Sequence, residues 1–118
     1  MTLLDDVADA IIDHAARDAP RECCGLLVGD ETQITLAIPA RNLATEPTRR
    51  YLIDPHDHLK AIRTARHRGE QVIGAYHSHP RGAALPSATD TAEAFAEFRF
   101  LIVGFAGDAP KLRAWMGT

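Results

Sequence analysis

Apolar residues recur along this 118-residue chain at two different spacings, and the alternation between the two is what most restricts its fold. In residues 2–18 the apolar residues recur every three or four positions, so on a helix they would form one stripe, and most aspartates lie outside it. This pattern predicts an amphipathic helix. Asp54 and Pro55 are typical of a helix start, as cap and first helical residue, and Gly69 closes the helix that follows. A third, short helix is expected over residues 87–97.

Short apolar runs bounded by turn residues predict the strands. These runs cover residues 23–28, 33–38, 50–53, 72–79, 100–105 and 111–115, and the last two are expected to pair as a hairpin. The elements then follow in the order α-β-β-β-α-β-α-β-β. This order predicts the α/β fold class, as an α+β arrangement in which helices flank one mixed sheet. A chain of this length buries one core, so we expect a single domain over residues 1–118.

Charge and hydropathy limit the kinds of partner. The formal net charge of −3 gives no general attraction to nucleic acid, and none is expected as a partner. No apolar run approaches the ~20 residues that cross a bilayer, so no membrane association is expected. The opening residues MTLLDDVADA carry acids where a signal peptide carries lysine or arginine. We therefore expect a cytoplasmic protein.

The two cysteines and several histidines are expected to have structural roles only. Cys23 and Cys24 are adjacent, and neighbouring strand side chains point to opposite faces, so a disulfide or a shared metal is disfavoured and burial is expected. Four histidines fall on the predicted helices without i, i+4 pairing to one another. These are His14, His56, His58 and His67, and we expect them at the surface or at helix ends.

His77 and His79 are the first candidates for chemistry. Residues two apart on a strand face the same way, so both imidazoles are expected on one face, where Pro80 stops the strand. Two neutral imidazoles placed in this way can share one Zn²⁺ at about 2.0–2.1 Å each. Taken alone, the pair is more readily explained as two solvated histidines at the end of a strand.

Asp90 and Glu22 are the acidic candidates. Asp90 stands early in the helix that Ser87 opens, and it can reach back as a third ligand, because catalytic zinc takes three protein ligands and keeps one open position. Serine followed three residues later by aspartate also resembles a capping box, which has no chemistry. Glu22 precedes a buried strand. It is either an ion-pair partner of Arg21 or another arginine, or a general base acting on zinc-bound water.

Together these residues resemble the signature of the JAMM (MPN+, Mov34/PAD-1) zinc metallopeptidases. That signature is a glutamate well upstream, then His-x-His followed by proline, and later a serine with an aspartate three positions on. Here seven residues separate His79 from Ser87, and two separate Ser87 from Asp90, as in the family pattern. The flanking stretches ECCGLLVG at 22–29 and IGAYH at 73–77 also match, and the resemblance covers most of the chain.

The resemblance implies a role for each matched residue. His77, His79 and Asp90 would hold one zinc ion per chain, and Glu22 would hold and deprotonate the water bound to it. Ser87 would donate a hydrogen bond to the oxyanion as water attacks a peptide or isopeptide carbonyl. The JAMM/MPN fold, which is similar to that of the cytidine deaminases, is implied as well.

The chain is short for this family and lacks the long insertions of eukaryotic deubiquitinating relatives. Its compact form resembles the prokaryotic branch, whose activities centre on ubiquitin-like sulfur-carrier proteins. That branch implies hydrolysis after the C-terminal Gly-Gly of such a carrier, which would be the partner. Two alternatives remain: a non-catalytic MPN-type binding or scaffold module, and a JAMM peptidase with another target, such as cell-wall or phage-tail peptides or a RadC-like association with DNA repair.

Overall fold

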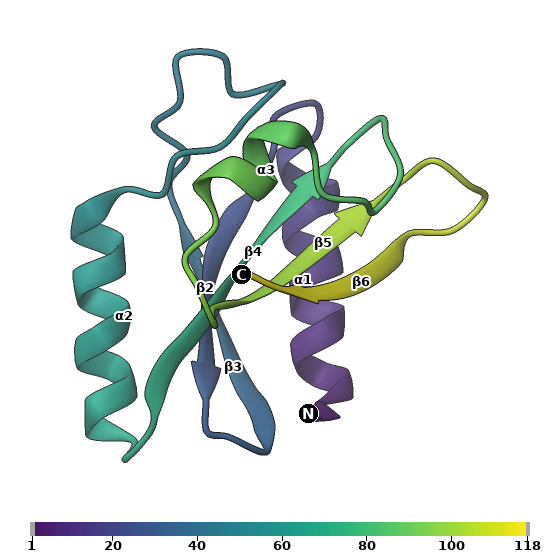
Figure 1. Ribbon diagram of the computed structural model, residues 1–118. Helices are drawn as coiled ribbons and strands as arrows, with labels where there is room; N and C mark the ends of the chain where they lie inside the picture. Colours follow the sequence, from purple (N-terminus) through teal and green to yellow (C-terminus); the bar gives the residue numbers. More distant parts are fainter. Residues whose placement is uncertain (1, 118) are drawn as a thin grey trace.

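A computed structural model describes residues 2–117 of the chain (Figure 1). The elements are β1 (Thr2–Leu3), α1 (Asp5–Asp18), β2 (Cys24–Gly29), β3 (Gln33–Ala40), α2 (Pro55–His67), β4 (Gln71–His79), α3 (Ala88–Glu93), β5 (Arg99–Gly104) and β6 (Lys111–Met116). The strands form a six-stranded sheet in the order β1-β3-β2-β4-β5-β6. Neighbours β1 and β3, and β4 and β5, are parallel, whereas the other pairs are antiparallel, so the predicted mixed sheet is confirmed.

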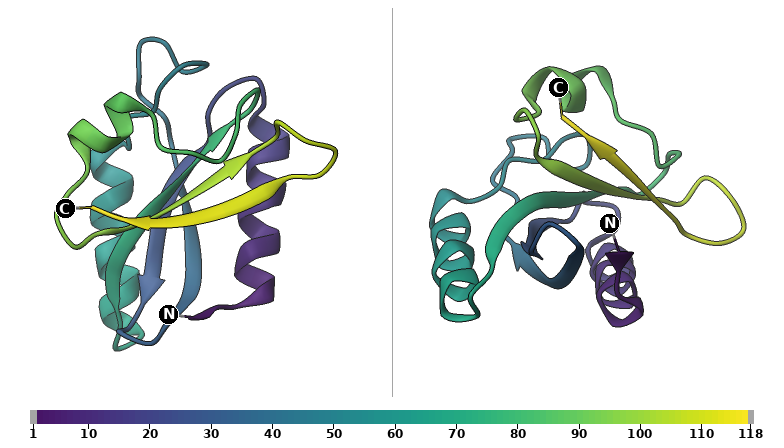
Figure 2. Two further views of the ribbon diagram at one scale, coloured as in Figure 1. Left: turned by 45° about the vertical axis from the view of Figure 1, so that its right-hand side comes forward. Right: turned by 60° about the horizontal axis from the view of Figure 1, so that its bottom comes forward.

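The main core lies between α1 and one face of the sheet. Its buried members from the helix and the strands are Val7, Ile11, Ala15, Cys23, Leu27, Ile34, Tyr76, Leu101 and Val103. Because side chains alternate along a strand, Cys24 and His77, which are paired across β2 and β4, face the other side. Helix α2 contacts these two strands, and Figure 2 shows α1 and α2 apart, with the β2–β3 hairpin between them.

The central strand β2 is buried along its whole length, which explains its uninterrupted apolar sequence. Leu26, Leu27 and Val28 are fully inaccessible to solvent. Burying one such side chain contributes roughly 1.5–3 kcal/mol relative to exposing it. This buried strand begins two residues after Glu22, which therefore lies close to a well-packed part of the sheet.

Helix α2 starts as its sequence predicts. The Asp54 side chain accepts a hydrogen bond from the His56 amide at 2.8 Å, and Pro55 takes the first helical position. Gly69 follows the helix with a φ of 71°, a conformation that a residue without a Cβ adopts readily.

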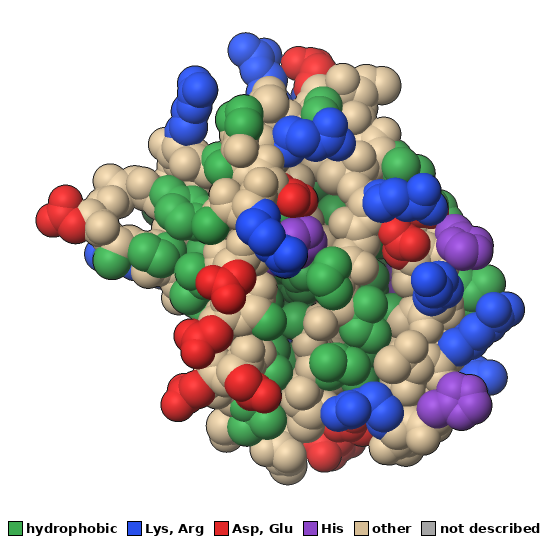
Figure 3. All heavy atoms as spheres, turned by 180° about the vertical axis from the view of Figure 1, so that it is seen from behind, with side chains coloured by type: hydrophobic (Ala, Val, Ile, Leu, Met, Phe, Trp, Pro, Cys, Tyr) green, Lys and Arg blue, Asp and Glu red, His purple; other side chains and the backbone are tan. Residues whose placement is uncertain are grey.

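Seen from behind, acidic side chains gather along α1 and basic ones along α2 (Figure 3). Both helices therefore expose the polar sides that an amphipathic pattern predicts.

Two predicted elements in the first half of the chain differ from the structure. Helix α1 starts at Asp5 rather than in residues 2–4, because Thr2 and Leu3 pair in parallel with β3 instead. Residues 50–53 were expected to form a strand, and this prediction is wrong: they make only an isolated bridge between Asn42 and Ile53. There, hydrogen bonds between the Asn42 side chain and the backbone of Arg50 and Leu52 take the place of a ladder between strands.

The third helix is shorter than the predicted range of 87–97 and ends at Glu93. Beyond it, Glu97 takes a positive φ of 64°, and its amide donates to the carbonyl of Gly117 at 3.0 Å. The ring of Phe98 packs edge-on against Phe100 on β5, with centroids 5.6 Å apart. Tertiary contacts with the carboxyl-terminal segment thus end the helix early.

His14 is buried, at 7% exposed, which corrects the prediction of a surface position. Its Nδ1 atom lies 2.7 Å from the hydroxyl of Tyr76, and its Nε2 atom lies 3.2 Å from Asp18. The pattern fits a neutral ring that accepts from Tyr76 and donates to Asp18. Burial lowers the pKa of His14, more than the nearby Asp18 raises it, which favours this neutral form.

Cys23 and Cys24 are free and fully buried, as predicted. Burial raises the pKa of the Cys23 thiol to about 11, so it stays protonated and unreactive at neutral pH.

Among residues 2–117, no helix is both long enough and apolar enough to cross a membrane.

Candidate active site

Three ligating atoms converge where β4 ends and α3 begins. The Nε2 atoms of His77 and His79 are 3.2 Å apart, and Oδ2 of Asp90 lies 3.1 and 3.2 Å from them. Ligands at 2.0–2.1 Å from a tetrahedral zinc ion are about 3.3–3.4 Å from one another. The triangle of atoms therefore has nearly the edge length that such an ion requires, and the three residues named from the sequence meet in space.

The second ring nitrogen of His79 shows which atom offers a lone pair. Nδ1 lies 2.9 Å from the carbonyl oxygen of Ala83, which can only accept, so Nδ1 carries a proton, and in the neutral ring Nε2 is the atom with the lone pair. The loop after β4 reaches this position because Gly104 has no side chain: a Cβ there would lie 2.3 Å from the amide nitrogen of Ala84. Close packing of this loop on β5 thus fixes the tautomer of His79.

Electrostatics favour an ionised carboxylate between the two imidazoles. The His77 side chain is completely buried, and burial lowers its pKa, although Asp90 opposes this effect. For Asp90, burial alone would raise the pKa, but hydrogen bonds from the two histidines hold it well below its usual range. The pKa of His79 is raised, chiefly by its hydrogen bond to Asp90. Asp90 is therefore ionised, and the cluster is suited to a cation.

Asp90 has two roles at once. The Oγ atom of Ser87 accepts from the Asp90 amide at 3.0 Å, and the Ser87 amide donates to Oδ2 of Asp90 at 2.9 Å, so a capping box opens α3. The same Oδ2 atom faces His77 and His79. The capping and ligand interpretations of this motif are thus compatible, since the cap holds the carboxylate where the imidazoles meet it.

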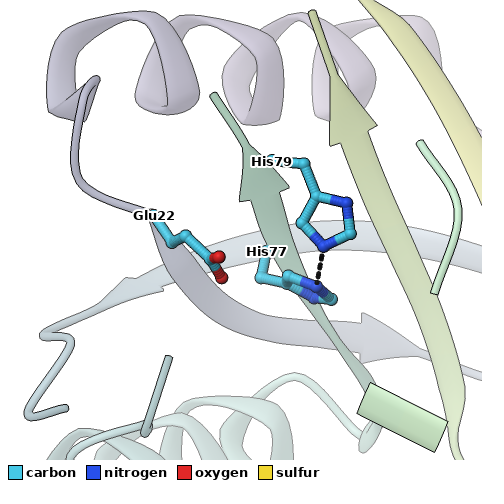
Figure 4. A group of neighbouring side chains, drawn as sticks. All are labelled: Glu22, His77 and His79. Atoms are coloured by element: carbon cyan, nitrogen blue, oxygen red, sulfur yellow. Dashed lines mark hydrogen bonds between the residues drawn. The ribbon is translucent and has the colours of Figure 1, made fainter. Parts of the chain in front are cut away.

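Glu22 lies two residues before the start of β2 and is 6% exposed. Its carboxylate lies within 4.8 Å of the ligating nitrogens of His77 and His79, towards which it points in Figure 4. Burial raises the pKa of Glu22 to about 7, with a smaller opposing effect of His79. Arg21, the alternative partner, donates instead to the carbonyl of Asn42 at 3.4 Å. Glu22 can therefore hold or release a proton near neutral pH.

The backbone of Glu22 is tied to the loop that follows β3. Its amide donates to the carbonyl of Pro47 at 2.7 Å, and its carbonyl accepts from the side chain of Asn42 at 3.0 Å. The same amide group of Asn42 donates to the carbonyl of Arg50 at 3.0 Å. Sequence reasoning missed Asn42, because an asparagine between two prolines indicates only a loop.

Tyr51 is a second residue that the sequence did not reveal. Its ring stacks on His77, with centroids 4.3 Å apart and planes inclined by 22°. The Nδ1 atom of His77 is buried and has no hydrogen-bond partner among the described residues. An aromatic residue in a short apolar run predicts a strand and core packing, so no local signal pointed to this contact.

Comparisons with known proteins point to one family. The family described as prokaryotic homologs of the JAB domain matches residues 4–117. A desampylase of Haloferax volcanii is 38% identical over 96 residues, which are 76% of this chain and 69% of that protein. A probable TtuB-protein conjugate cleaving protease of Thermus thermophilus is 38% identical over 94 residues, 80% and 63% of the two chains. A CysO-cysteine peptidase of Mycobacterium tuberculosis is 38% identical over 87 residues, 72% and 59% of the two.

Solved structures show the same fold. A solution structure of a protein from Desulfitobacterium hafniense superposes with a TM-score of 0.87 at 30% identity, covering 98% of this chain and 82% of that one. The crystal structure of a JAB1/MPN domain protein from Archaeoglobus fulgidus has a TM-score of 0.64 at 19% identity, with 98% and 89% covered. From its sequence match, its fold and its relatives, the chain belongs to the family of prokaryotic homologs of the JAB domain.

Proposed function

We propose that this protein is a zinc-dependent peptidase or isopeptidase that hydrolyses the bond after the C-terminal Gly-Gly of a ubiquitin-like or sulfur-carrier protein. In this proposal His77, His79 and Asp90 hold one zinc ion, Glu22 moves the proton and Ser87 stabilises the oxyanion. The observation that carries it is the triangle of two imidazole nitrogens and one carboxylate oxygen, with edges of 3.1–3.2 Å, beside a buried glutamate.

The donor set suits zinc. Two imidazoles and one carboxylate are ligands that zinc commonly takes in hydrolytic sites, where a fourth position stays open. In its neutral form His79 directs the Nε2 lone pair to the place that the charge of Asp90 also faces, and a cation there would satisfy both. When bound, the ion supplies a Lewis acid that polarises the substrate carbonyl and lowers the pKa of a coordinated water to about 7.

Glu22 is placed for proton transfer rather than for ligation. Its carboxylate lies within 4.8 Å of the ligating histidine nitrogens, close enough to accept a proton from a water molecule held beside them. The carboxylate accepts a proton from the attacking water and then donates it to the amine that leaves. Burial raises the pKa of Glu22 to about 7 in the metal-free protein, so this carboxyl holds a proton more readily than an exposed glutamate, which suits the second step. Such general acid–base catalysis contributes about 10²–10⁴-fold to the rate.

Ser87 supplies a donor at the edge of the same site. Its Oγ atom already accepts from the Asp90 amide, so its own hydroxyl hydrogen remains available for a substrate oxygen. The cap fixes the position of Ser87 next to the carboxylate that faces the histidines. Removing one donor of this kind from a hydrolytic site costs about 10²–10³-fold in turnover.

The substrate class comes from the relatives. One is named for cleaving TtuB-protein conjugates and another for acting on CysO-cysteine, and the matched region covers 63% and 59% of these proteins. We extend this class to the present chain because the pattern of site residues is complete here. A complete pattern favours catalysis over a scaffold role. We also propose a cytoplasmic location, to which the two free, buried thiols conform.

The direct test is cleavage of defined carrier fusions. Zinc-loaded protein is incubated with several ubiquitin-like and sulfur-carrier proteins, each extended after Gly-Gly by a short peptide, and the products are weighed by mass spectrometry. We expect a carrier ending in Gly-Gly, and no product after chelation. A matched carrier with Gly-Gly changed to Val-Val should not be cleaved.

Three outcomes would contradict the proposal. A protein that binds no zinc indicates the scaffold alternative. A zinc-loaded protein that ignores every Gly-Gly tail but cleaves cell-wall or phage-tail peptides indicates the other target. An active Glu22→Ala variant would show that the proton is moved by a different group.

A further inference from the structure

We propose that Tyr51 is a positioning residue of the metal centre, which holds the His77 ring at the angle where its Nε2 atom meets His79 and Asp90. The inference rests on the proposed function, because it concerns a zinc ion held by these three residues. It assigns a role to a residue outside the sequence motif that identified the site.

The two histidines of the site are oriented by different means. Nδ1 of His79 donates to the carbonyl of Ala83 at 2.9 Å, which is the usual way in which proteins orient a ligating imidazole. Nδ1 of His77 is buried and has no such partner among the described residues. The torsion that turns an imidazole about its Cβ–Cγ bond is soft, so a ring without a hydrogen bond needs another restraint.

Stacking by Tyr51 provides that restraint. The two rings are nearly parallel, 22° apart in orientation and 4.3 Å apart at their centroids. Turning the His77 ring would drive its edge into the tyrosine face, so the contact blocks the motion that would carry Nε2 out of the triangle. A cation on Nε2 makes the imidazole electron-poor, and an electron-poor ring is attracted to the face of an aromatic side chain.

Tyr51 is itself held on both sides. The side chain of Asn42 donates to the carbonyl of Arg50 at 3.0 Å and accepts from the amide of Leu52 at 3.0 Å. The carbonyl of Leu52 accepts from the amide of Leu43 at 2.8 Å. The residues before and after Tyr51 are therefore fixed by one asparagine, which also binds the carbonyl of Glu22.

Tyr51 also forms part of the wall of a groove of about 350 Å³ beside the site. The groove is mostly apolar, with Leu26, Ile53 and Phe100 among its lining residues. Removing the tyrosine ring would open the His77 side of the site to this groove. Burial raises the pKa of the phenol well above its usual range, so Tyr51 stays neutral and acts through His77 rather than as a ligand or base.

The test compares metal affinity in three Tyr51 variants and one control variant of the full chain. Tyr51→Phe keeps the stacked ring, whereas Tyr51→Leu and Tyr51→Met remove it but keep an apolar side chain. Leu52→Ala is the matched control, since Leu52 lines the same groove, is 57% exposed and is not stacked on His77. Zinc affinity is measured by competition with a chromophoric chelator, the ligand field by the absorption of Co²⁺-substituted protein, and folding by circular dichroism.

We expect Tyr51→Leu and Tyr51→Met to bind zinc about 10–100-fold more weakly than the wild type, with an altered Co²⁺ spectrum, as for loss of other groups that orient metal ligands. Tyr51→Phe and Leu52→Ala should match the wild type in both measurements. If either folded variant without the ring binds zinc as tightly as the wild type, with the same Co²⁺ spectrum, the inference is wrong. If the wild type itself binds no zinc, the result contradicts the proposed function. A wild type that binds zinc, with ring-free variants that bind it equally well, contradicts only the role of Tyr51.

Discussion

The amide of Cys23 donates to Oγ of Ser78 at 2.8 Å, and the amide of Ser78 donates back to the carbonyl of Cys23 at 3.2 Å. This reciprocal pair joins the residue after Glu22 to the residue between His77 and His79. Ser78 is completely buried, so its hydroxyl replaces a backbone acceptor that would otherwise complete the ladder between β2 and β4. The contact sets the distance between the glutamate and the two imidazoles.

Replacing Ser78 by alanine should slow hydrolysis without releasing zinc. The Cys23 amide would lose its acceptor in the interior, which costs about 1–3 kcal/mol, and the chain at Glu22 would shift to find another. We expect kcat to fall about tenfold or more, since a displacement near 1 Å is costly in a catalytic site. Zinc content and substrate KM should change little. Ser78→Thr keeps the hydroxyl and should restore kcat; equal losses in both variants would indicate a packing effect instead.

Glu22 should make the metal-free protein less stable as pH rises. Its pKa is about 7 when folded, against an ordinary value of 4.5. Between these values the folded state keeps a proton that the unfolded state has lost, so the free energy of unfolding decreases from pH 4.5 to about 7. Glu22→Gln removes this dependence. In excess chelator, we expect the variant to be more stable than the wild type by about 1–3 kcal/mol at pH 8, and equal to it near pH 4.

Urea denaturation of both proteins from pH 4 to pH 8 measures this difference. Comparing the two at each pH cancels the contributions of other groups, such as His14. A difference that is constant across the range, or larger at low pH, would show that Glu22 is not held in a desolvating environment.

Substitutions of Asp90 should separate its two roles. Asp90→Asn keeps an oxygen that can accept from the Ser87 amide, but it loses the charge that faces the histidines. We expect zinc affinity to fall at least 100-fold while the thermal stability of the metal-free protein changes little. Asp90→Ala should lose the cap as well, at a further cost of about 1 kcal/mol. Asp108→Asn, on the β5–β6 turn, is the control with the same charge change, and a similar loss of affinity there would discount the ligand role.

Tyr76→Phe should destabilise the fold and leave the site intact. The change removes the hydroxyl that donates to Nδ1 of His14. This buried nitrogen then has no hydrogen-bond partner, at a cost of about 1–3 kcal/mol. Tyr76 faces α1, on the side of β4 opposite His77, so zinc affinity should be unaffected. Chemical denaturation and metal titration of the same sample measure both quantities. A weakened zinc site would show that the two faces of β4 are coupled.

Much of this architecture follows from local patterns. The apolar runs of β2, β4 and β5 and the cap at Asp54 are strong signals, because strand burial and helix capping depend on few residues. The prediction failed where distant contacts override a local preference. Residues 50–53 have strand-like composition, yet Asn42 holds them in a loop and Tyr51 turns to His77.

The candidate site was predictable to the extent that its residues form a spaced pattern. The histidines two apart and the aspartate after a tight loop converge as that spacing implies. The residues that contact Glu22, His77 and His79 from outside the motif are Asn42, Tyr51 and Ala83, which come from three separate segments and use a side-chain amide, a ring face and a carbonyl. No regular spacing relates them, so only the folded chain reveals their roles. The single domain over residues 1–118 stays a prediction.

The location of the metal is the most direct test of this account. A crystal of zinc-loaded protein, with an anomalous difference map collected at the zinc edge, should show one peak per chain, about 2.0–2.1 Å from Nε2 of both His77 and His79. The same peak should lie within bonding distance of Asp90, with Glu22 outside the ligand set. A protein that takes up no zinc, or a peak held by other residues, would contradict the proposed hydrolase.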